Sequence, residues 1–309
     1  MTGGAGFIGS YMCEELVKLG KKVICFDNLS TGSLNNILKL KNNKNFTFIE
    51  GDANKFDDLE PVFKKYKIDG VFHYAALVGV KRTMENPLAV MEDINGIKNV
   101  LELSLKYNKP KVVFSSSSEV YGEPERLPEK EDGPLNPRMP YAVVKLAGEK
   151  FLEAYSNKYN LKTCALRFFN VYGPRQESSD YGFVVGIFIK QVLSGNSPTI
   201  FGDGSQTRDF TFIDDNVEAS WRAMQSEKAN GLVINIGSGR PLTIYNLAND
   251  VIRACGFTGK ISPKFVKVKR DDVRHRFPEV ANMAKVLDFR PQTSLEEGLK
   301  RTILYYKNA

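Results

Sequence analysis

Histidine is almost absent from this sequence, which holds only His73 and His275 in 309 residues. A zinc site or a histidine-based catalytic triad therefore has almost no residues from which it could be built, and we expect no metal. Long apolar runs are absent too. The run 183–189 ends at Lys190, far short of the roughly 20 residues that a membrane helix needs, so we expect no association with a membrane.

Paired cysteines are also missing. The four cysteines, Cys13, Cys25, Cys164 and Cys255, are scattered, which predicts buried, reduced thiols in a cytoplasmic protein. The net charge of +7 suits an anionic ligand. Basic residues are spread along the chain rather than interleaved with aromatic ones, so we do not expect nucleic-acid binding. The one local cluster, residues 264–270, is either a solvated loop or a phosphate contact.

What the sequence does contain is a glycine-rich opening, Thr2-Gly3-Gly4-Ala5-Gly6-Phe7-Ile8-Gly9. Such glycines allow a tight turn, a close approach to phosphate and the packing of a helix on a strand. An apolar run then ends at Asp27, about 20 residues on, where a dinucleotide ribose is bound. A carboxylate there accepts two ribose hydroxyls and repels a further phosphate, and residues 28–31 bring no arginine. The segment therefore predicts NAD rather than NADP.

Strand-like and helix-like runs alternate over residues 9–167. The strand-like runs are 23–26, 46–49, 70–74, 112–115 and 163–168, and apolar residues recur at helical spacing in 87–106 and 141–159. This alternation predicts an α/β fold, a doubly wound parallel (Rossmann) sheet with helices on both faces and ligands at the carboxyl ends of its strands.

After Asn170 turns become frequent, which predicts a second, smaller α/β domain that binds the substrate. We expect the first domain to comprise residues 1–168 and 208–239, and the second to comprise 169–207 and 240–309. A first strand of roughly five residues should precede the glycine turn. Because Met1 stands directly before that turn, we expect the natural chain to be longer.

Three polar residues form a candidate catalytic set. Tyr141 and Lys145 are four apart and so share one face of a predicted helix. A nearby ammonium favours the phenolate, which predicts a lowered pKa for Tyr141, and the same lysine can hydrogen-bond the nicotinamide ribose. Ser117 follows the strand-like run 112–114, at a strand end where it can hydrogen-bond a sugar hydroxyl or the carbonyl formed from it.

These motifs resemble those of the extended short-chain dehydrogenase/reductase family, specifically its nucleotide-sugar epimerases and dehydratases. The resemblance runs from residue 2 to about residue 306 and rests on residues 2–9, 51–52, 73–76, 115–122, 141–145, 167–176, 202–210 and 290–299. It implies that NAD is bound by Gly3, Gly6, Phe7, Ile8, Gly9, Asp27, Asn28, Asp52, Ala53, Ala75, Ala76 and Lys145.

The resemblance also implies a reaction. Tyr141 removes the proton of a sugar hydroxyl, normally at C4, while hydride passes to NAD, and Ser117 hydrogen-bonds the resulting 4-keto sugar. In an epimerase the keto ring then rotates and hydride returns to its opposite face. The UDP-sugar is implied to be held by Lys81, Ser117, Asn170, Arg208, Arg270 and Arg276. A homodimer through the helices 87–106 and 141–159 is implied as well.

Two residues leave the reaction class open. Glu119 resembles the proton-handling glutamate of dehydratases and decarboxylases, and residues 274–279, which include Arg276, resemble an Arg-x-Pro-acid stretch of UDP-glucuronate decarboxylases. Glu119 can instead be a solvated turn residue, and Arg276 a diphosphate contact. Residues 75–83 and 179–183 resemble 4-epimerases.

We therefore predict an NAD-dependent 4-epimerase of a UDP-hexose. A UDP-glucuronate decarboxylase or a nucleotide-sugar 4,6-dehydratase is the alternative, since both share the 4-keto intermediate. A catalytically silent NAD-binding regulator is disfavoured by the intact set of Ser117, Tyr141 and Lys145, because a binding module has no need of an activated phenol.

Overall fold

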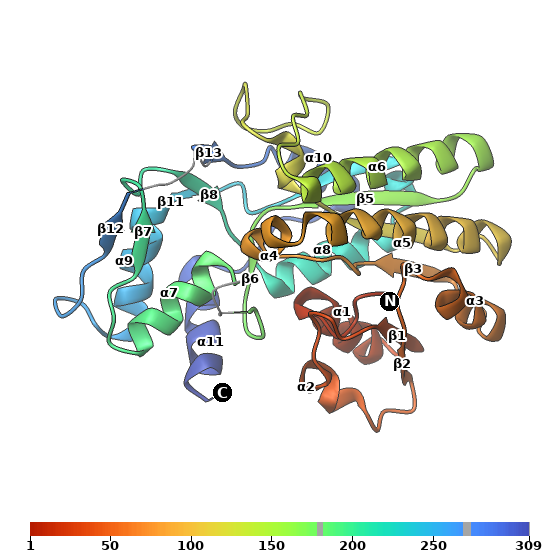
Figure 1. Cartoon of the computed structure of the whole chain (residues 1–309), viewed down its shortest axis with the longest axis horizontal. Helices are drawn as coiled ribbons and strands as arrows, with labels where there is room; N and C mark the ends of the chain where they lie inside the picture. Colours follow the sequence, from red (N-terminus) through yellow and green to blue (C-terminus); the bar gives the residue numbers. More distant parts are fainter. Residues whose placement is uncertain (178–181, 268–272, 309) are drawn as a thin grey trace.

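A parallel sheet with helices on both faces forms the larger part of the molecule, as predicted (Figure 1). The computed structural model describes residues 1–177, 182–267 and 273–308, and only the backbone of Val80 and Lys81. Among the described helices none combines the length and apolarity that a membrane span requires. All four cysteines are buried and free of disulfides, which confirms the prediction of buried, reduced thiols.

The sheet has the strand order β2-β1 on one side and β3-β4-β5-β10 on the other. Its strands are β1 (Val23–Asp27), β2 (Phe46–Glu50), β3 (Gly70–His73), β4 (Lys111–Ser117), β5 (Thr163–Phe168) and β10 (Leu232–Ile236). Thr2 bridges the two parts, because it pairs with both Phe26 and His73. The Phe26 amide also donates to the Met1 carbonyl, at 2.8 Å. Met1 and Thr2 thus lie at the centre of the sheet, and a longer first strand stays a prediction.

Helices cover each face of this sheet. One face carries α3 (Phe56–Lys65), α5 (Pro87–Lys106) and α6 (Pro140–Tyr159), and the other carries α1 (Phe7–Lys18), α8 (Ile213–Gln225) and α10 (Ala281–Leu287). Successive side chains of a strand point to opposite faces. Accordingly Val113 of β4 packs in the core under α1 and α8, whereas Val112 and Phe114 pack in the core under α5 and α6.

The remaining elements form a second lobe beside the sheet (Figure 1). They are β6 (Val171–Tyr172), α7 (Val184–Leu193), β7 (Thr199–Phe201), β8 (Thr207–Asp209), β9 (Thr211–Phe212), β11 (Pro241–Thr243), α9 (Ile244–Cys255), β12 (Lys264–Val266), β13 (His275–Arg276) and α11 (Leu295–Lys307). Short connections complete the chain: α2 (Leu34–Ile37), η1 (Leu38–Leu40), α4 (Val80–Glu85), η2 (Ser118–Tyr121) and η3 (Glu227–Ala229).

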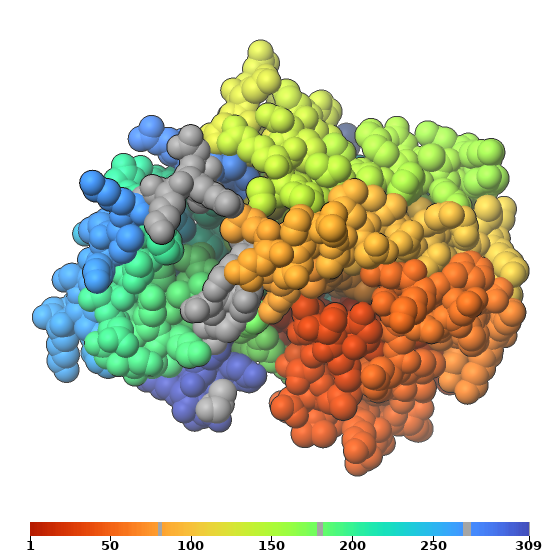
Figure 2. Space-filling model, viewed as in Figure 1, coloured from red at the N-terminus to blue at the C-terminus, as the bar shows by residue number. Residues whose placement is uncertain are grey.

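The two lobes share one hydrophobic core, which continues from α1 and α8 into α7, α9 and α11. Figure 2 shows the second lobe, in green and blue, beside the orange and red segments of the first. The polypeptide enters the second lobe immediately after β5, and later returns through α8, β10 and α10. The carboxyl ends of β4 and β5 therefore face β8 and β13 of the second lobe, and the predicted site residues gather there.

Candidate active site

The glycine turn packs tightly against the end of β3. Gly3 has a φ of +68°, and a Cβ at this position would lie 2.6 Å from the Ala75 nitrogen. At Gly9 a Cβ would lie 2.0 Å from the Gly3 carbonyl oxygen. Helix α1 starts directly after Gly6, so its first amides are directed at the turn. Amides at a helix N-terminus bind anions, so this turn fits a pyrophosphate.

Asp27 stands at the end of β1 and holds the loops on either side of it. Its Oδ2 accepts from the Ala5 amide and its Oδ1 from the Leu29 amide, both at 2.8 Å. The residue is only 7% exposed. Each carboxylate oxygen keeps a second lone pair with which a ribose hydroxyl could bond. The carboxylate therefore fits the ribose of a dinucleotide.

The other residues predicted to hold the dinucleotide border the same strand ends. Ala53 is buried and Asn28 exposed, while the Asp52 carboxylate accepts from the Asn54 amide at 3.0 Å. The Ala75 amide donates to Thr2 Oγ1 at 3.4 Å, and Ala76 is half-buried. The structure thus brings the two sets of loops, after β1 and β2 and after β3, to one edge of the sheet.

The predicted catalytic residues also come together. Ser117 ends β4, Tyr141 lies in the first turn of α6, and the Tyr141 hydroxyl is hydrogen-bonded to Ser117. Lys145 is buried, with its Nζ 5.5 Å from the centre of the Tyr141 ring and 3.4 Å from Ser115 Oγ. A phenol, a hydroxyl and an amine thus meet at the carboxyl end of β4.

The electrostatics of this set differ from the prediction. Burial raises the pKa of Tyr141; the hydrogen bond to Ser117 opposes this rise, and the charges of Glu119 and Asp93 add to it. The prediction that the Lys145 ammonium gives a lowered tyrosine pKa is therefore wrong in direction for the protein alone. Burial also lowers the pKa of Lys145 to about 8, against the attraction of Asp93.

Asp93 was not predicted from the sequence. It lies on α5, and its carboxylate accepts from the Leu77 amide at 2.8 Å and the Asn54 side-chain amide at 3.4 Å. From there its charge acts on both Tyr141 and Lys145. An acid on the apolar face of an amphipathic helix, among Val90, Ile94 and Ile97, was the signal available.

Glu119 and Arg276, which are 157 residues apart in the sequence, form an ion pair. The Arg276 side chain is 4% exposed and that of Glu119 38%. Arg276 Nη2 lies 3.4 Å from the Gly122 carbonyl oxygen. Glu119 is therefore a paired residue of the site rather than a solvated turn residue.

The remaining predicted substrate contacts divide into two groups. Arg208 and Asn170 lie at the site. Arg208 is buried, and its backbone is in register with that of Arg276 where β8 pairs with β13. The Asn170 side-chain amide donates to the Asp209 carbonyl at 2.9 Å. Lys81 lies in α4, but its side chain is outside the described part of the chain, as is the whole of Arg270.

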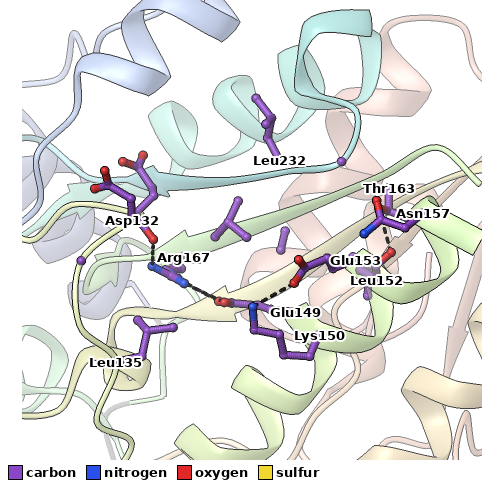
Figure 3. Close-up of a pocket in the computed structure, with 15 residues that line it drawn as sticks. Asp132, Leu135, Glu149, Lys150, Leu152, Glu153, Asn157, Thr163, Arg167 and Leu232 are labelled. Atoms are coloured by element: carbon purple, nitrogen blue, oxygen red, sulfur yellow. Dashed lines mark hydrogen bonds and ion pairs between the residues drawn. The ribbon is translucent and has the colours of Figure 1, made fainter.

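Further along α6 from the site, around Glu149, lies a closed polar network. Glu149 accepts from Arg167 Nε at 2.9 Å, from Arg167 Nη2 at 2.7 Å and from Ser116 Oγ at 2.5 Å. Arg167 also donates to the Tyr121 hydroxyl at 2.8 Å. Glu149 and Arg167 line a cavity of about 430 Å³ between α6, β5 and β10 (Figure 3). The lining of this cavity does not include Ser117, Tyr141 or Lys145.

Comparison with known proteins agrees with this geometry. A model described as the NAD dependent epimerase/dehydratase family matches residues 1–237. The chain is 36% identical to a putative UDP-glucose 4-epimerase of Methanocaldococcus jannaschii, over 100% of this chain and 98% of that protein. It is 37% identical to a UDP-N-acetyl-alpha-D-glucosaminuronate decarboxylase of Bacillus cytotoxicus, over 99% and 97%.

Among solved structures, a UDP-glucose 4-epimerase with UDP-glucose from Thermotoga maritima has a TM-score of 0.93 and 35% identity, covering 99% of this chain and 97% of that one. These similarities agree with the predicted resemblance and identify an enzyme whose cofactor is NAD. The chain belongs to the NAD dependent epimerase/dehydratase family.

Proposed function

We propose that the protein is a 4-epimerase of a UDP-hexose that acts through a bound 4-keto intermediate. The observation that carries the proposal is the meeting of Ser117, Tyr141 and Lys145 beside a glycine turn that fits a dinucleotide. Relatives that are named 4-epimerases and match over nearly the whole chain support it.

The residues divide the chemistry among them. Tyr141 acts as its phenolate, which takes the proton of the sugar hydroxyl, and the phenol so formed later gives the proton back; Ser117 holds the sugar oxygen beside it. Lys145 places a positive charge near the Tyr141 ring, and Asp93 keeps that amine in position. NAD, when bound, supplies a hydride acceptor and donor, so the protein's task is to fix geometry and charge around the sugar. Arg208 and Asn170 hold the diphosphate side.

The ion pair of Glu119 with Arg276 favours a neutral sugar. The guanidinium is balanced by a carboxylate of the protein itself, that of Glu119 in this structure, so a neutral hexose meets no uncompensated positive charge at that point. A buried charge without a partner is costly, and the pair removes that cost without a carboxylate from the substrate.

A decarboxylase of a UDP-uronate is the second candidate, and the same ion pair supports it. Arg276 could exchange Glu119 for the sugar carboxylate, which would release Glu119 to return a proton at C5 once carbon dioxide has left. The similarity to a uronate decarboxylase in Bacillus cytotoxicus, at 37% identity, favours this candidate equally.

Product analysis distinguishes the two. The purified protein is incubated with UDP-glucose, its N-acetyl analogue and UDP-glucuronate in parallel, and the nucleotide sugars are separated and identified. A 4-epimerase converts one of the first two into its galacto form and releases no carbon dioxide from UDP-glucuronate. A UDP-pentose formed from UDP-glucuronate would replace the epimerase proposal with the decarboxylase.

We also propose that the protein is a cytoplasmic homodimer. Apolar side chains are exposed on both helices expected at the interface, Leu88 and Met91 on α5 and Val143 and Phe151 on α6. These helices already pack against each other within one chain, so a second copy would complete a four-helix bundle.

A further inference from the structure

Glu129 is a buried carboxyl group whose surroundings are unusual. The residue is 3% exposed, and neither side-chain oxygen makes a hydrogen bond of good geometry among the described residues; the polar group that acts on them most directly is the Phe277 backbone amide. Its backbone is fixed from both sides, since its amide donates to the Phe277 carbonyl at 3.0 Å and its carbonyl accepts from the Glu279 amide at 2.8 Å. A buried polar group without a partner costs stability, so its retention calls for a role.

The groups that face Glu129 belong to the site. Charge from Arg276 on β13, from Arg208 on β8 and from Glu119 at η2 acts on its carboxyl group. The two arginines are directly paired in the register of β8 and β13, and like charges opposite each other repel. Arg276 Nε is itself buried without a hydrogen-bond partner among the described residues. An unused donor and an unused acceptor thus occur in one charged cluster.

We propose that Glu129 is a second carboxyl partner of Arg276, which holds the guanidinium in place when Glu119 turns to the bound sugar. Glu129 is a positioning residue in this scheme, because it acts on the sugar only through Arg276. The reason for this exchange of partners, from Glu119 to Glu129, rests on the proposed function. The ability of Arg276 to pair with either carboxylate does not.

The exchange requires one proton to move. Burial raises the pKa of Glu129 to about 8, Arg276 and Arg208 oppose the rise and Glu119 adds to it, so Glu129 is protonated at neutral pH while Arg276 is paired with Glu119. When Glu119 leaves, the proton of the Glu129 carboxyl passes to water and the carboxylate pairs with Arg276. The guanidinium keeps one negative partner throughout.

A double-mutant cycle tests this pairing without any assay of activity. Thermal unfolding is measured at pH 7 for the full chain, for Glu119→Gln, for Glu129→Gln and for the double variant. Each single variant should lose at most a few degrees, because one carboxyl group remains. The double variant leaves a buried guanidinium unpaired and should unfold about 5 °C or more below the additive expectation. Additive losses would overturn the proposal.

Two further measurements keep the test decisive. If the double variant does not fold, adding Arg276→Met should restore folding, because the unpaired charge is then gone; no restoration would contradict the proposal.

Since the folded protein holds the Glu129 proton between about pH 5 and 8 and the unfolded chain does not, stability from this group falls as pH rises through that window. Glu129→Gln should remove that fall, and Glu125→Gln, an exposed acid of the same loop, should not.

Kinetics test the positioning role. With whichever of UDP-glucose, its N-acetyl analogue and UDP-glucuronate proves to be the substrate, Glu129→Gln should lower kcat by about 10-fold and leave KM nearly unchanged, since a hydrogen bond to a charged group is lost during turnover. An unchanged kcat would exclude the role in turnover. If none of the three nucleotide sugars reacts with the unmodified protein, the proposed function fails, while the stability cycle still decides the pairing.

Discussion

Two neighbouring serines of β4 contact α6 at different places and meet different environments. Ser116 donates to Glu149, where Arg167 bonds to both carboxylate oxygens and the ion pair is almost fully buried; we call this the Glu149 network. Ser117 is hydrogen-bonded to Tyr141, near the arginine cluster in which Arg276 Nε and the Glu129 oxygens have no partner within the described ranges; we call this the Tyr141 site. One network is closed, and the other has unused donors and acceptors.

The difference separates structural groups from ligand-binding ones. Both networks contain a buried arginine and a glutamate, so burial and charge alone do not distinguish them. A closed network stabilises one arrangement of the chain, whereas unpaired buried groups cost stability unless a ligand or a rearrangement satisfies them. Changes at the Tyr141 site should therefore alter turnover more than stability, and changes in the Glu149 network should do the reverse.

Tyr141→Phe should produce the largest effect at the Tyr141 site. It removes the hydroxyl and keeps the ring, so turnover should fall by about 10²–10⁴-fold while NAD binding and the unfolding temperature stay nearly unchanged. Initial rates with the preferred UDP-sugar, together with cofactor content after purification, measure this. Tyr155→Phe on the same helix is the control and should retain full turnover. Near-normal rates in Tyr141→Phe would show that another group takes the proton.

Glu149→Gln should produce the largest effect in the Glu149 network. It leaves the Arg167 guanidinium buried beside an uncharged amide, and breaking a buried ion pair in this way costs about 3–5 kcal/mol. Urea unfolding monitored by circular dichroism measures the loss. Glu153→Gln, four residues further along α6 in an exposed pair with Lys150, should change the free energy of unfolding by less than about 1 kcal/mol. Equal losses in the two variants would contradict the contrast between the Glu149 network and the Tyr141 site.

The sequence predicted the elements of the sheet better than the charges around them. Helix α5 has the predicted bounds, because Pro87 favours a helix start and its apolar residues recur at helical spacing. The tight turn at Gly3 and Gly9 is likewise predictable from the local spacing of the glycines alone. Glu129 could not be found in this way, since it lies in an irregular loop and is buried by contacts with residues 277–279. The pKa of Tyr141 was misjudged for the same reason, because burial depends on tertiary packing.

A smaller effect is expected from Lys145 in the cofactor-free protein. Burial lowers its pKa from 10.5 to about 8, so between these values the unfolded chain binds a proton that the folded protein does not. Stability from this group therefore rises with pH across that window, by roughly 1–3 kcal/mol in total. The difference in unfolding free energy between the unmodified protein and Lys145→Met should increase by that amount from pH 7.5 to 9.5. If the unfolding free energies of the two proteins change with pH in parallel, the amine is not buried. Lys150→Met serves as the exposed control.

The smallest expected effect concerns the outer surfaces of α5 and α6. Leu88 is 81% exposed in the single chain, and Met91 on the same helix is 43% exposed. If two copies pair through these helices, Leu88→Asp is present twice at the interface, and dimer affinity should fall by about 10-fold or more while turnover per chain changes little. Sedimentation velocity over a micromolar concentration series measures the shift. Leu304→Asp, at an exposed position on α11, should leave the dimer intact. If the unmodified protein sediments as a monomer throughout the series, the proposed dimer is wrong and the exposed apolar residues of α5 and α6 require another explanation.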